Sequence, residues 1–556
     1  MSQVNTTEIN KISKKHVIIC LSIIATISII LKLYTMDLSN PLHSDPLGYS
    51  LAAISHTQGD FSQSSHRGIG WSIFVSFFYN FINSDNYLVY SNTIRIISSG
   101  IAVSTIFLVY LLGRKFFNEK YSIVVAALFA FEPHLNYNSG FGLTEPFYHL
   151  AIIGAFYFAI NKNTKFIIPS LLLVGVIWWT RFNGITFFII LIIIFFVTKR
   201  NSPNFYRNLS IGILLFLIIV DPMLYQRAVQ FDDPLYFYYS QYLFSGSWEN
   251  AISIEYENTQ SSAQKYIDEN GIASFLKIYV IDGLYNTLSA LWTITFPYLF
   301  ILVPFGIIFS FRAFDQEKNK ISATWIMIIL SLGTLIVTFS IIPEKRYLYY
   351  IFPFLIILSV IPIQRVTEYG LSTFSFTQKQ KTIFLVIVLI IALLLSVWFT
   401  TRYEPSDNLL ENEKYQFAQF AVQNLNGNSL REFGDSFDYL SLAYVEKSPN
   451  GFKDCKVEFS KNLCNYDKEN GFLKRITVTG NSIEEIISNG ENYDLKYIVT
   501  NEKENEFRGF VDKIYSNEEK YPYLKKIFDS ELENYEKLKI KIFEINYKKF
   551  NTFIKD

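Results

Sequence analysis

HSDPLGYSLAAISHTQGDFSQSSHRGIGW, residues 43–71, is a polar stretch between two apolar ones. One long apolar run precedes it and a shorter one, at 71–82, follows. Irregular polar backbone at a bilayer surface needs partners that lipid cannot supply, so it is most useful where it lines a site. The stretch therefore predicts a functional loop at a membrane surface. Asp45 is its leading candidate for a catalytic base.

The composition is that of a multi-span membrane protein with a soluble part attached. Of 556 residues, 50% are hydrophobic and 18% are charged. Basic and acidic residues balance at 49 each, so no excess of basic residues argues for a nucleic-acid partner. Apolar runs stop near Phe399, and charged residues crowd the rest. We predict a transmembrane domain at 1–401, with outer loops at 37–91 and 223–287, and a soluble α/β domain at 402–556.

About 11 segments are apolar enough to be transmembrane helices, although several fall short of the roughly 20 residues of a straight span. They are 17–36, 92–112, 121–137, 145–160, 165–179, 184–198, 208–222, 288–311, 321–341, 348–363 and 382–399. The run at 71–82 is too short to span, and counting it would invert every later helix. We expect it to be an interfacial or re-entrant helix on the outer face.

The basic residues of the short loops predict the orientation. One set of alternate loops holds most of them, including Lys14, Lys115, Lys165, Arg200 and Arg365. This set is expected to be cytoplasmic, together with the N-terminus. The loop of Asp45 and the C-terminal domain are then outside a cytoplasmic (plasma) membrane.

The apolar pattern of the C-terminal domain predicts one helix near 408–425 and several short strands. The strand-like runs are SLREF (429–433), YLSLAYV (439–445), CKVEF (455–459), RITVTG (475–480), LKYIVT (495–500) and LKIKIFEIN (538–546). If this domain lies outside, a disulfide between Cys455 and Cys464 is expected. No cysteine spacing indicates a metal site, and no histidine pair could complete one.

Two carboxylates stand at predicted helix starts. Asp45 precedes Pro46, so it could be an ordinary N-cap with proline at the first helical position, which is compatible with a catalytic role. Glu145 precedes Pro146, where the helix dipole alone would favour an acid. The functional alternative makes Glu145 a second carboxylate near Asp45 that positions the acceptor or tunes a pKa.

Three arginines lie at the edges of apolar segments. Arg181 sits between two of them with almost no loop, and Arg346 lies at the mouth of another. A cation this close to hydrocarbon marks a substrate path or an ion pair, or it simply snorkels to the interface. Arg67, beside His66, allows the same alternatives. If the substrate is a lipid phosphate, guanidinium groups at helix mouths are its natural partners.

The order of these landmarks resembles the GT-C glycosyltransferases, especially protein O-mannosyltransferases and lipid A aminoarabinose transferases. The resemblance rests on Asp45 with Tyr49, Gly59 with Asp60, RGIGWSIFVSFFYNF (67–81), RIISSGIAVSTIFLVYLLGRKFF (95–117), LTEP (143–146), TRFNG (180–184) and EKRYLYYIFPFL (344–355). Many relatives have Pro-Pro-Gly before the short apolar segment, where this chain has His66, Arg67 and Gly68. The acceptor loop is therefore expected to differ in shape.

The resemblance implies transfer of a monosaccharide from a polyprenyl (dolichyl) phosphate to an acceptor hydroxyl, with inversion, on the outer face of the membrane. It implies these roles: Asp45 as general base, Glu145 as a second catalytic-site carboxylate at the start of the fourth helix, Arg67, Arg181 and Arg346 as donor-phosphate ligands, and Tyr49, Asp60 and His66 in the acceptor loop. Membrane lipids, the lipid-linked donor and a protein, glycan or lipid acceptor are the expected partners. The first loop lacks a paired Asp-x-Asp, so we expect no metal or other cofactor.

Other functions remain open at this point. An oligosaccharyltransferase-like relative would differ in acceptor and in metal use. A transporter or flippase of lipid-linked sugars is less favoured, because no two halves of the sequence resemble inverted repeats. A binding module anchored by helices would not need so many spans.

Overall fold

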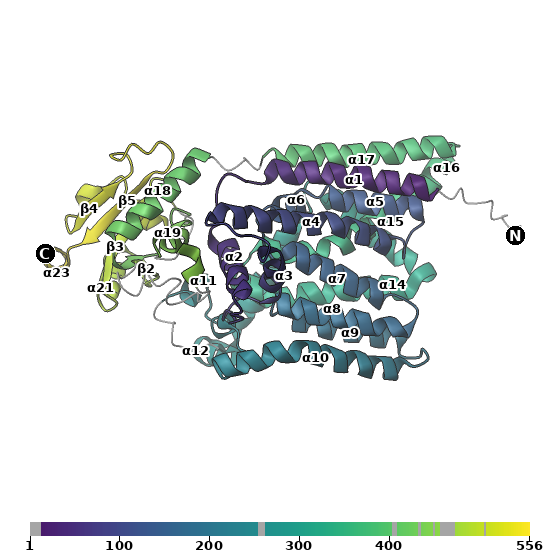
Figure 1. The fold of residues 1–556 in the computed structure, drawn as a ribbon, viewed down its shortest axis with the longest axis horizontal. Coiled ribbons are helices and arrows are strands. Elements are labelled where there is room, and N and C mark those ends of the chain that lie inside the picture. Colours follow the sequence, from purple (N-terminus) through teal and green to yellow (C-terminus); the bar gives the residue numbers. More distant parts are fainter. Residues whose placement is uncertain are drawn as a thin grey trace, which may run out of the picture.

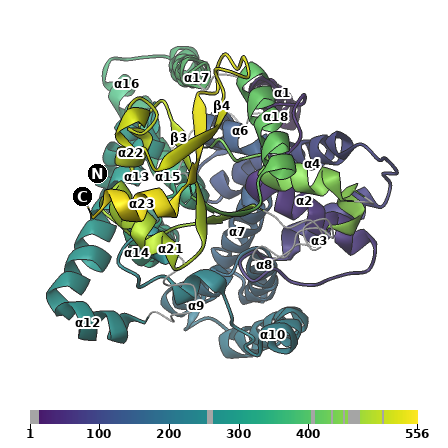
Figure 2. The same ribbon diagram turned by 90° about the vertical axis from the view of Figure 1, so that its left-hand side faces the viewer.

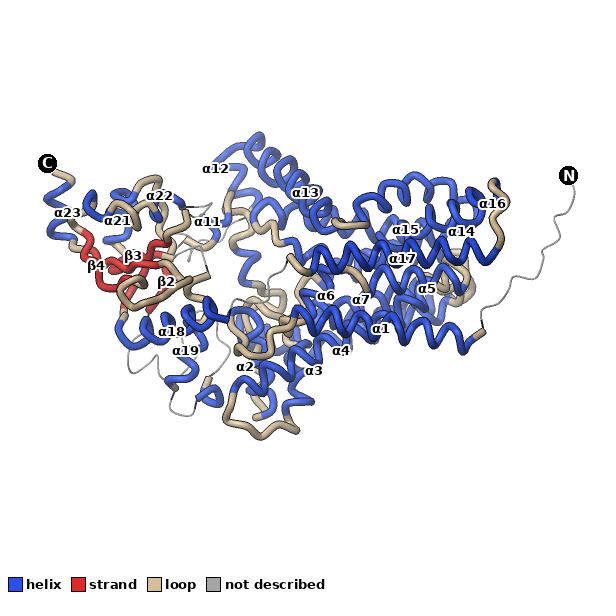
Figure 3. Tube along the Cα trace, turned by 90° about the horizontal axis from the view of Figure 1, so that it is seen from above, coloured by secondary structure: helices blue, strands red, loops and turns tan. Residues whose placement is uncertain are grey.

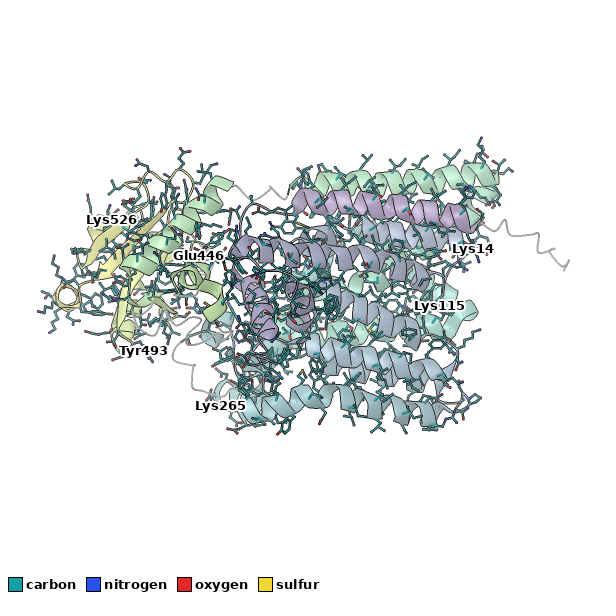
Figure 4. The ribbon with its side chains drawn as sticks, viewed as in Figure 1. Lys14, Lys115, Lys265, Glu446, Tyr493 and Lys526 are labelled. Carbon is teal, nitrogen blue, oxygen red and sulfur yellow. The ribbon has the colours of Figure 1, made fainter. Side chains whose placement is uncertain are left out.

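The computed structural model describes residues 13–253, 262–402, 408–431, 435–448, 451–455, 473–504 and 508–555. Long helices lie side by side and form a bundle, and a small α/β unit sits at one end of it (Figure 1). Lys14 and Lys115 lie toward the opposite end (Figure 4). The α/β unit and these basic residues therefore lie at opposite ends of the bundle, and which end faces the cytoplasm stays a prediction.

Among the described residues, six helices are long and apolar enough to cross a membrane, so this is a multi-pass membrane protein. They are Lys14–Thr35 (α1), Tyr87–Gly113 (α4), Phe205–Phe231 (α10), Lys318–Ile341, Lys345–Thr373 and Gln378–Thr400 (α17). A bent pair, Ala263–Thr295 with Leu299–Phe311, could make a seventh. The last spans are made of several labelled helices, which include α13 (Gly283–Thr295), α14 (Leu299–Ile341), α15 (Phe352–Arg365) and α16 (Leu371–Thr373).

Shorter helices complete the bundle: α5 (Glu119–Ala130), α6 (Pro133–Ser139), α7 (Glu145–Ala159), α8 (Ile167–Thr180) and α9 (Gly184–Lys199). The predicted span 121–137 is divided between α5 and α6. The carboxylate of Glu132 accepts a hydrogen bond from the backbone N of Leu135 at 2.8 Å, and Pro133 opens the new helix. The predicted count of about 11 spanning helices is not confirmed.

Two short helices, α2 (Ser44–Thr57) and α3 (Gly70–Tyr79), lie across the long axis at the end that carries the α/β unit (Figure 1). Helix α3 covers most of the run at 71–82, which was expected to be interfacial rather than spanning. Its apolar residues face both the protein and the surroundings, since Trp71 is buried and Phe77 is 63% exposed. The first outer loop is thus a helical layer at the mouth of the bundle.

The second outer loop begins later than predicted, because α10 continues to Phe231. Its last turns carry Gln226, Arg227 and Gln230, whose side chains all bond to the loop at 61–64. These contacts favour the extra helical turns beyond Pro222. The loop itself holds η2 (Tyr238–Gln241), α11 (Trp248–Ala251) and α12 (Ala263–Leu276). Viewed from that end, α12 lies at the outer edge of the molecule (Figure 2).

The α/β unit is a five-stranded sheet in the order β2-β1-β3-β5-β4. Its strands are β1 (Gly427–Leu430), β2 (Leu473–Ile476), β3 (Leu495–Asn501), β4 (Leu524–Asp529) and β5 (Ile540–Ile545). β1 pairs in parallel with β2 and β3, whereas β5 is antiparallel to β3 and β4. Figure 3 shows these strands confined to one end of a molecule that is otherwise helical.

Helices cover both faces of this sheet, chiefly α18 (Asn408–Asn424), α19 (Leu440–Lys447), α21 (Ile483–Glu491) and α23 (Tyr547–Phe553). The predicted helix and four of the predicted strands are present in part. The prediction for 439–445 is wrong, because these residues form α19. Nearly every residue of that run is buried, and a short apolar run does not distinguish a strand from a buried helix. In the run 455–459, only Cys455 is described.

One apolar cluster joins the α/β unit to the bundle. It contains Leu47, Trp71 and Tyr90 of the bundle end and Phe417 and Tyr444 of the α/β unit. Polar contacts flank it: Arg508 forms an ion pair with Glu249, and a lone parallel bridge links Ser253 with Thr477. Burial of this cluster holds the α/β unit firmly over the mouth of the bundle.

Candidate active site

Asp45 lies in the first turn of α2, where two arginines hold its carboxylate. Nη2 of Arg67 donates to Oδ1 at 2.7 Å, and Nη2 of Arg346 donates to Oδ2 at 2.9 Å. The residue before the helix is His43, so Asp45 is not the N-cap that its position before Pro46 allowed. Its side chain remains 43% exposed. Asp45 is therefore both fixed in direction and accessible.

Arg67 is packed tightly beneath this carboxylate. Its side chain is only 5% exposed, and its guanidinium lies 5.3 Å from the ring centre of Tyr49. Gly48 makes room for it, because a Cβ atom there would lie 2.1 Å from Nη1 of Arg67. The predicted acceptor-loop residue Tyr49 is thus buried as a support for Arg67.

Gly48→Ala is expected to leave the protein folded and to lower donor turnover by about tenfold or more. The clash involves the far end of a flexible side chain, so Arg67 would swing away from Asp45 while the backbone stays in place. Thermal unfolding and turnover of a polyprenyl-phosphate sugar would be measured together. Gly100→Ala is the matched control, because nothing lies within 4 Å of the added carbon. Full activity of Gly48→Ala would mean that this placement of Arg67 is not needed.

Arg346 and Arg181 meet at one aromatic ring, that of Tyr347. The guanidinium carbons lie 5.8 Å and 5.6 Å from its centre, respectively. Arg346 precedes Tyr347 in η5 (Lys345–Ile351), whereas Arg181 follows α8. The structure thus brings the two arginines together, as their expected shared role requires. Each is partly accessible, with side-chain exposures of 24% and 18%.

Contacts run from Asp45 through Arg346, Tyr347 and Arg181 to Glu145, the most buried of these residues. Glu145 begins α7, is 1% exposed and forms an ion pair with Nη2 of Arg181. Nε of Arg181 also donates to the hydroxyl of Thr144 at 3.0 Å. The second oxygen of Glu145 has no hydrogen-bond partner among the described residues. Glu145 therefore orients Arg181 and keeps one buried acceptor atom.

The other two predicted loop residues, Asp60 and His66, make local contacts. Asp60 forms a local turn, accepting from the backbone N of Ser62 at 3.0 Å. His66 lies next to Arg67, and its ring is 5.9 Å from that of Tyr239. The roles of Asp60 and His66 toward an acceptor stay predictions.

The sequence analysis did not predict Arg227, which contacts two of the loops that carry the site arginines. Its side chain is fully buried, and Nη1 donates to the backbone carbonyl of Ser64 at 3.2 Å. Its guanidinium lies 4.2 Å from the ring centre of Phe182, the neighbour of Arg181. Arg227 thus holds the loop before Arg67 and the turn after Arg181. The signal that could have found it was an arginine close to the hydrophobic segment at 208–222, but the predicted boundary placed Arg227 in a loop.

Burial and neighbouring charges together set the pKa values around Asp45. Burial alone would raise the pKa of Asp45, but the guanidinium groups of Arg67 and Arg346 hold it well below its usual range. Burial, and then the charge of Arg67, lower the pKa of His66 to about 3. Burial raises the pKa of Tyr239 to about 12, and the negative charge of Asp45 adds to the effect. At neutral pH, Asp45 is therefore ionised and His66 is neutral.

Two further predictions concern metals and the disulfide. Within the described ranges, no group of three or more His, Cys, Asp or Glu side chains could hold a metal ion. Cys20 is a free thiol, and Cys455 is disulfide-bonded. Its expected partner, Cys464, lies outside the described residues, so the predicted pairing stays a prediction.

Comparison with solved structures identifies the fold. The chain is similar to the oligosaccharyltransferase of Archaeoglobus fulgidus in the apo form, with a TM-score of 0.57 and 14% identity over 90% of this chain and 71% of that one. It is similar to AglB from the same organism in complex with an inhibitory peptide and a dolichol-phosphate, with a TM-score of 0.56 and 13% identity over 90% and 71% of the two chains.

A further similarity is to ArnT from Cupriavidus metallidurans bound to undecaprenyl phosphate, with a TM-score of 0.49 and 11% identity over 96% of this chain and 98% of that one. No family model and no curated protein matches the sequence. The chain has the GT-C fold of membrane glycosyltransferases with a C-terminal α/β unit, so the predicted fold class is confirmed.

Proposed function

We propose that this protein is a membrane glycosyltransferase. It transfers a monosaccharide from a polyprenyl-phosphate donor to an acceptor hydroxyl on the outer face of the membrane, with inversion. The observation that carries the proposal is the carboxylate of Asp45, accessible and held between Arg67 and Arg346 at the mouth of a GT-C bundle. Similarity to AglB, solved with a dolichol-phosphate, supports a lipid-phosphate donor.

The chemistry needs one base and one cationic region. The acceptor oxygen forms a bond to the anomeric carbon, and the bond from that carbon to the phosphate oxygen breaks. The electron pair leaves with the phosphate, which needs no strong acid because cations stabilise its charge. The proton of the hydroxyl passes to Asp45. Attack from the face opposite the phosphate inverts the anomeric centre.

Arg346 links donor binding to the basicity of Asp45. A carboxylate held by two guanidinium groups is a weak base, because protonation would weaken both ion pairs. Arg346 is 24% exposed, whereas Arg67 is 5% exposed, so Arg346 is the one that can turn toward a phosphate. Once the donor phosphate attracts Arg346, Asp45 keeps only Arg67 as a close partner. Its pKa then rises toward the range that proton transfer needs.

Arg181 and Glu145 complete the donor side. Arg181 shares Tyr347 with Arg346, so a phosphate near that ring could contact both guanidinium groups. The unpartnered oxygen of Glu145 can accept a hydrogen bond from a sugar hydroxyl. In this proposal Glu145 acts by orientation and does not itself transfer a proton.

The pH profile of kcat/KM is expected to lack an acid limb between about pH 8 and about pH 5. The pKa of Asp45 is depressed, so its ion pairs persist over this window and would be lost only as pH falls further. The pKa of His66, about 3, keeps that ring neutral throughout. Initial rates across this window would be compared in wild type and His66→Gln. An acid limb near pH 6 that disappears in His66→Gln would contradict the assignment.

Metal independence forms part of the proposal. Two guanidinium groups already occupy the carboxylate of Asp45, and such a positive environment disfavours a divalent cation there. An excess of chelator should therefore leave the rate unchanged. Loss of activity with chelator, restored by added Mg²⁺ or Mn²⁺, would favour the oligosaccharyltransferase-like alternative.

The direct test uses purified full-length protein with a panel of radiolabelled polyprenyl-phosphate sugars. The expected result is time-dependent release of polyprenyl phosphate and sugar transfer with inverted anomeric configuration. Movement of intact donor across vesicles without chemical change would support the transporter alternative, which the fold of its structural neighbours does not favour.

A further inference from the structure

Asn183 lies in the turn that joins α8 to α9, two residues after Arg181. The backbone N of Gly184 donates to the carbonyl of Arg181 at 2.9 Å, which closes this turn. The turn is packed against the end of α8, because a Cβ atom on Gly184 would lie 2.3 Å from Cα of Trp178. Arg181 and Asn183 are therefore held together in one rigid turn.

The side chain of Asn183 does not make the contact that its position predicts. Asn183 is the N-cap of α9, where an asparagine side chain ordinarily accepts from an N–H group of the first helical turn. It makes no such bond here. Its Oδ1 accepts instead from the hydroxyl of Tyr148 at 2.8 Å. A side chain that gives up the expected local contact for a tertiary one points to a role beyond the fold.

Tyr148 joins Asn183 to Arg181. This tyrosine is 1% exposed, and its ring centre lies 5.3 Å from the guanidinium carbon of Arg181. The same guanidinium is 5.6 Å from the ring centre of Tyr347. The amide of Asn183 and the guanidinium of Arg181 therefore contact one buried phenol, the amide at its hydroxyl and the guanidinium at its ring.

Asn183 lies on the face of α9 that meets η5. Phe187, four residues later, shares this face and is 2% exposed. Its ring is 5.8 Å from that of Tyr148 and 5.2 Å from that of Tyr350. Tyr350 belongs to η5, the segment that carries Arg346. Asn183 is exposed at the end of this face, so it is accessible on the side of α9 where the donor is proposed to bind.

The amide nitrogen of Asn183 remains for a ligand. Tyr148 occupies the amide oxygen, and Nδ2 has no hydrogen-bond partner among the residues that the structure describes. An amide nitrogen only donates, so it suits an oxygen acceptor, and the neighbouring guanidinium of Arg181 favours an acceptor with negative charge. Within the proposed donor site, the group that meets both conditions is a phosphate oxygen.

We propose that Asn183 binds the donor phosphate through Nδ2, beside Arg181, and that Tyr148 is the residue that positions it. This inference rests on the proposed glycosyltransferase function and adds a neutral hydrogen-bond donor to its phosphate site. Arg181 and Arg346 are each engaged in ion pairs with carboxylates of the site. The amide has no such competitor, so it is available to the phosphate from the start.

Binding of farnesyl phosphate to purified full-length protein in detergent measures this contact without any sugar transfer. We expect Asn183→Ala to raise the Kd about tenfold and Asn183→Asp to raise it about 100-fold. An aspartate retains an oxygen for the hydroxyl of Tyr148, but it replaces the donor nitrogen by a second oxygen that repels phosphate. Binding of farnesol, which has the same chain without the phosphate, should be unchanged in both variants.

Asn163→Asp is the matched control. It makes the same change of charge beyond the end of α7 that is opposite Glu145. Asn163 is exposed, and its Oδ1 accepts from the backbone N of Lys165 at 3.0 Å, which a carboxylate oxygen can also do. Its Kd for farnesyl phosphate should equal that of wild type.

Tyr148→Phe tests the positioning role. The ring that packs against Arg181 remains, but the hydroxyl that orients Asn183 is lost. We expect the Kd for farnesyl phosphate and the donor KM to rise by less than in Asn183→Ala, with kcat at saturating donor unchanged. A fall in thermal stability with no change in Kd or KM would make the Tyr148 contact purely structural and overturn this part of the proposal.

The Asn183 assignment and the transferase proposal fail separately. If Asn183→Asp binds farnesyl phosphate as wild type does, the assignment is overturned. Equal losses of farnesol and farnesyl phosphate, or no binding of farnesyl phosphate by wild type, also overturn it, whereas sugar transfer alone decides the transferase proposal. The expected pattern supports a lipid-phosphate site at Asn183, even if a failure to turn over any donor overturns the transferase proposal.

Discussion

Asp45→Asn is expected to lower kcat for sugar transfer by about 10²- to 10⁴-fold while the protein remains folded. The amide keeps the shape of the carboxylate and one oxygen acceptor, but it cannot take the proton of the attacking hydroxyl. Asp45 is 43% exposed, and the amide oxygen can still accept a hydrogen bond from the buried Arg67, so the protein should remain folded despite the loss of the ion pair. Initial rates with a polyprenyl-phosphate sugar and an acceptor would measure the effect, alongside thermal unfolding.

The same variant separates a base from a structural residue. Asp45→Asn removes the group that competes with a donor phosphate for Arg346, so the donor KM should stay unchanged or fall while kcat collapses. Asp233→Asn is the matched control. Asp233 is exposed in the second outer loop, and its side chain accepts from the backbone N of Leu235 at 2.8 Å, which an amide oxygen can also do. Turnover near wild type in Asp45→Asn would remove the general-base assignment.

Arg346→Ala is expected to raise the donor KM by roughly 10- to 100-fold, because a charge-assisted contact to phosphate contributes about 1.5–3 kcal/mol. Acceptor KM should change far less, since Arg346 is proposed to leave Asp45 for the donor. Arg365→Ala is the control on the same run of helix. Arg365 lies in the last turn of α15, toward the far end of the Lys345–Thr373 span from Arg346.

Arg346→Lys refines this result. A lysine retains the charge but not the planar fork, so it should recover part of the donor affinity and little of the contact to Asp45. Equal losses toward donor and acceptor in Arg346→Ala would argue against phosphate binding. A fall in thermal stability with unchanged KM would make Arg346 only a structural partner of Asp45.

Much of the site was predictable because charges near hydrocarbon are costly. Asp45, Glu145, Arg181 and Arg346 each stand where a helix meets an outer loop, and the structure joins them through Tyr347. The same rule would have singled out Arg227, but that residue was placed in a predicted loop. The loop boundary was wrong because bonds from the end of α10 to the first loop, which hydropathy does not report, extend that helix.

The α/β unit was less predictable in detail. Alternation identified β3 and β5, whose residues point in turn to opposite faces: Tyr497 and Val499 pack on one side and Ile498 on the other. The run at 439–445 has no exposed face to reveal its period, and it became α19. Strand β4 lies at the edge of the sheet, carries two exposed lysines, Lys525 and Lys526, and was not predicted.

Hydropathy, charge and motif order were enough to establish a membrane bundle, an end domain and the polar loop of Asp45, because each is a property of neighbouring residues. The pairing of Asp45 with Arg346, 301 positions away, depended on helices crossing at one mouth of the bundle. So did the space at Gly48 for Arg67 and the contacts of Arg227 with Ser64 and Phe182. Such contacts follow from packing between distant segments, which no local pattern along the chain encodes.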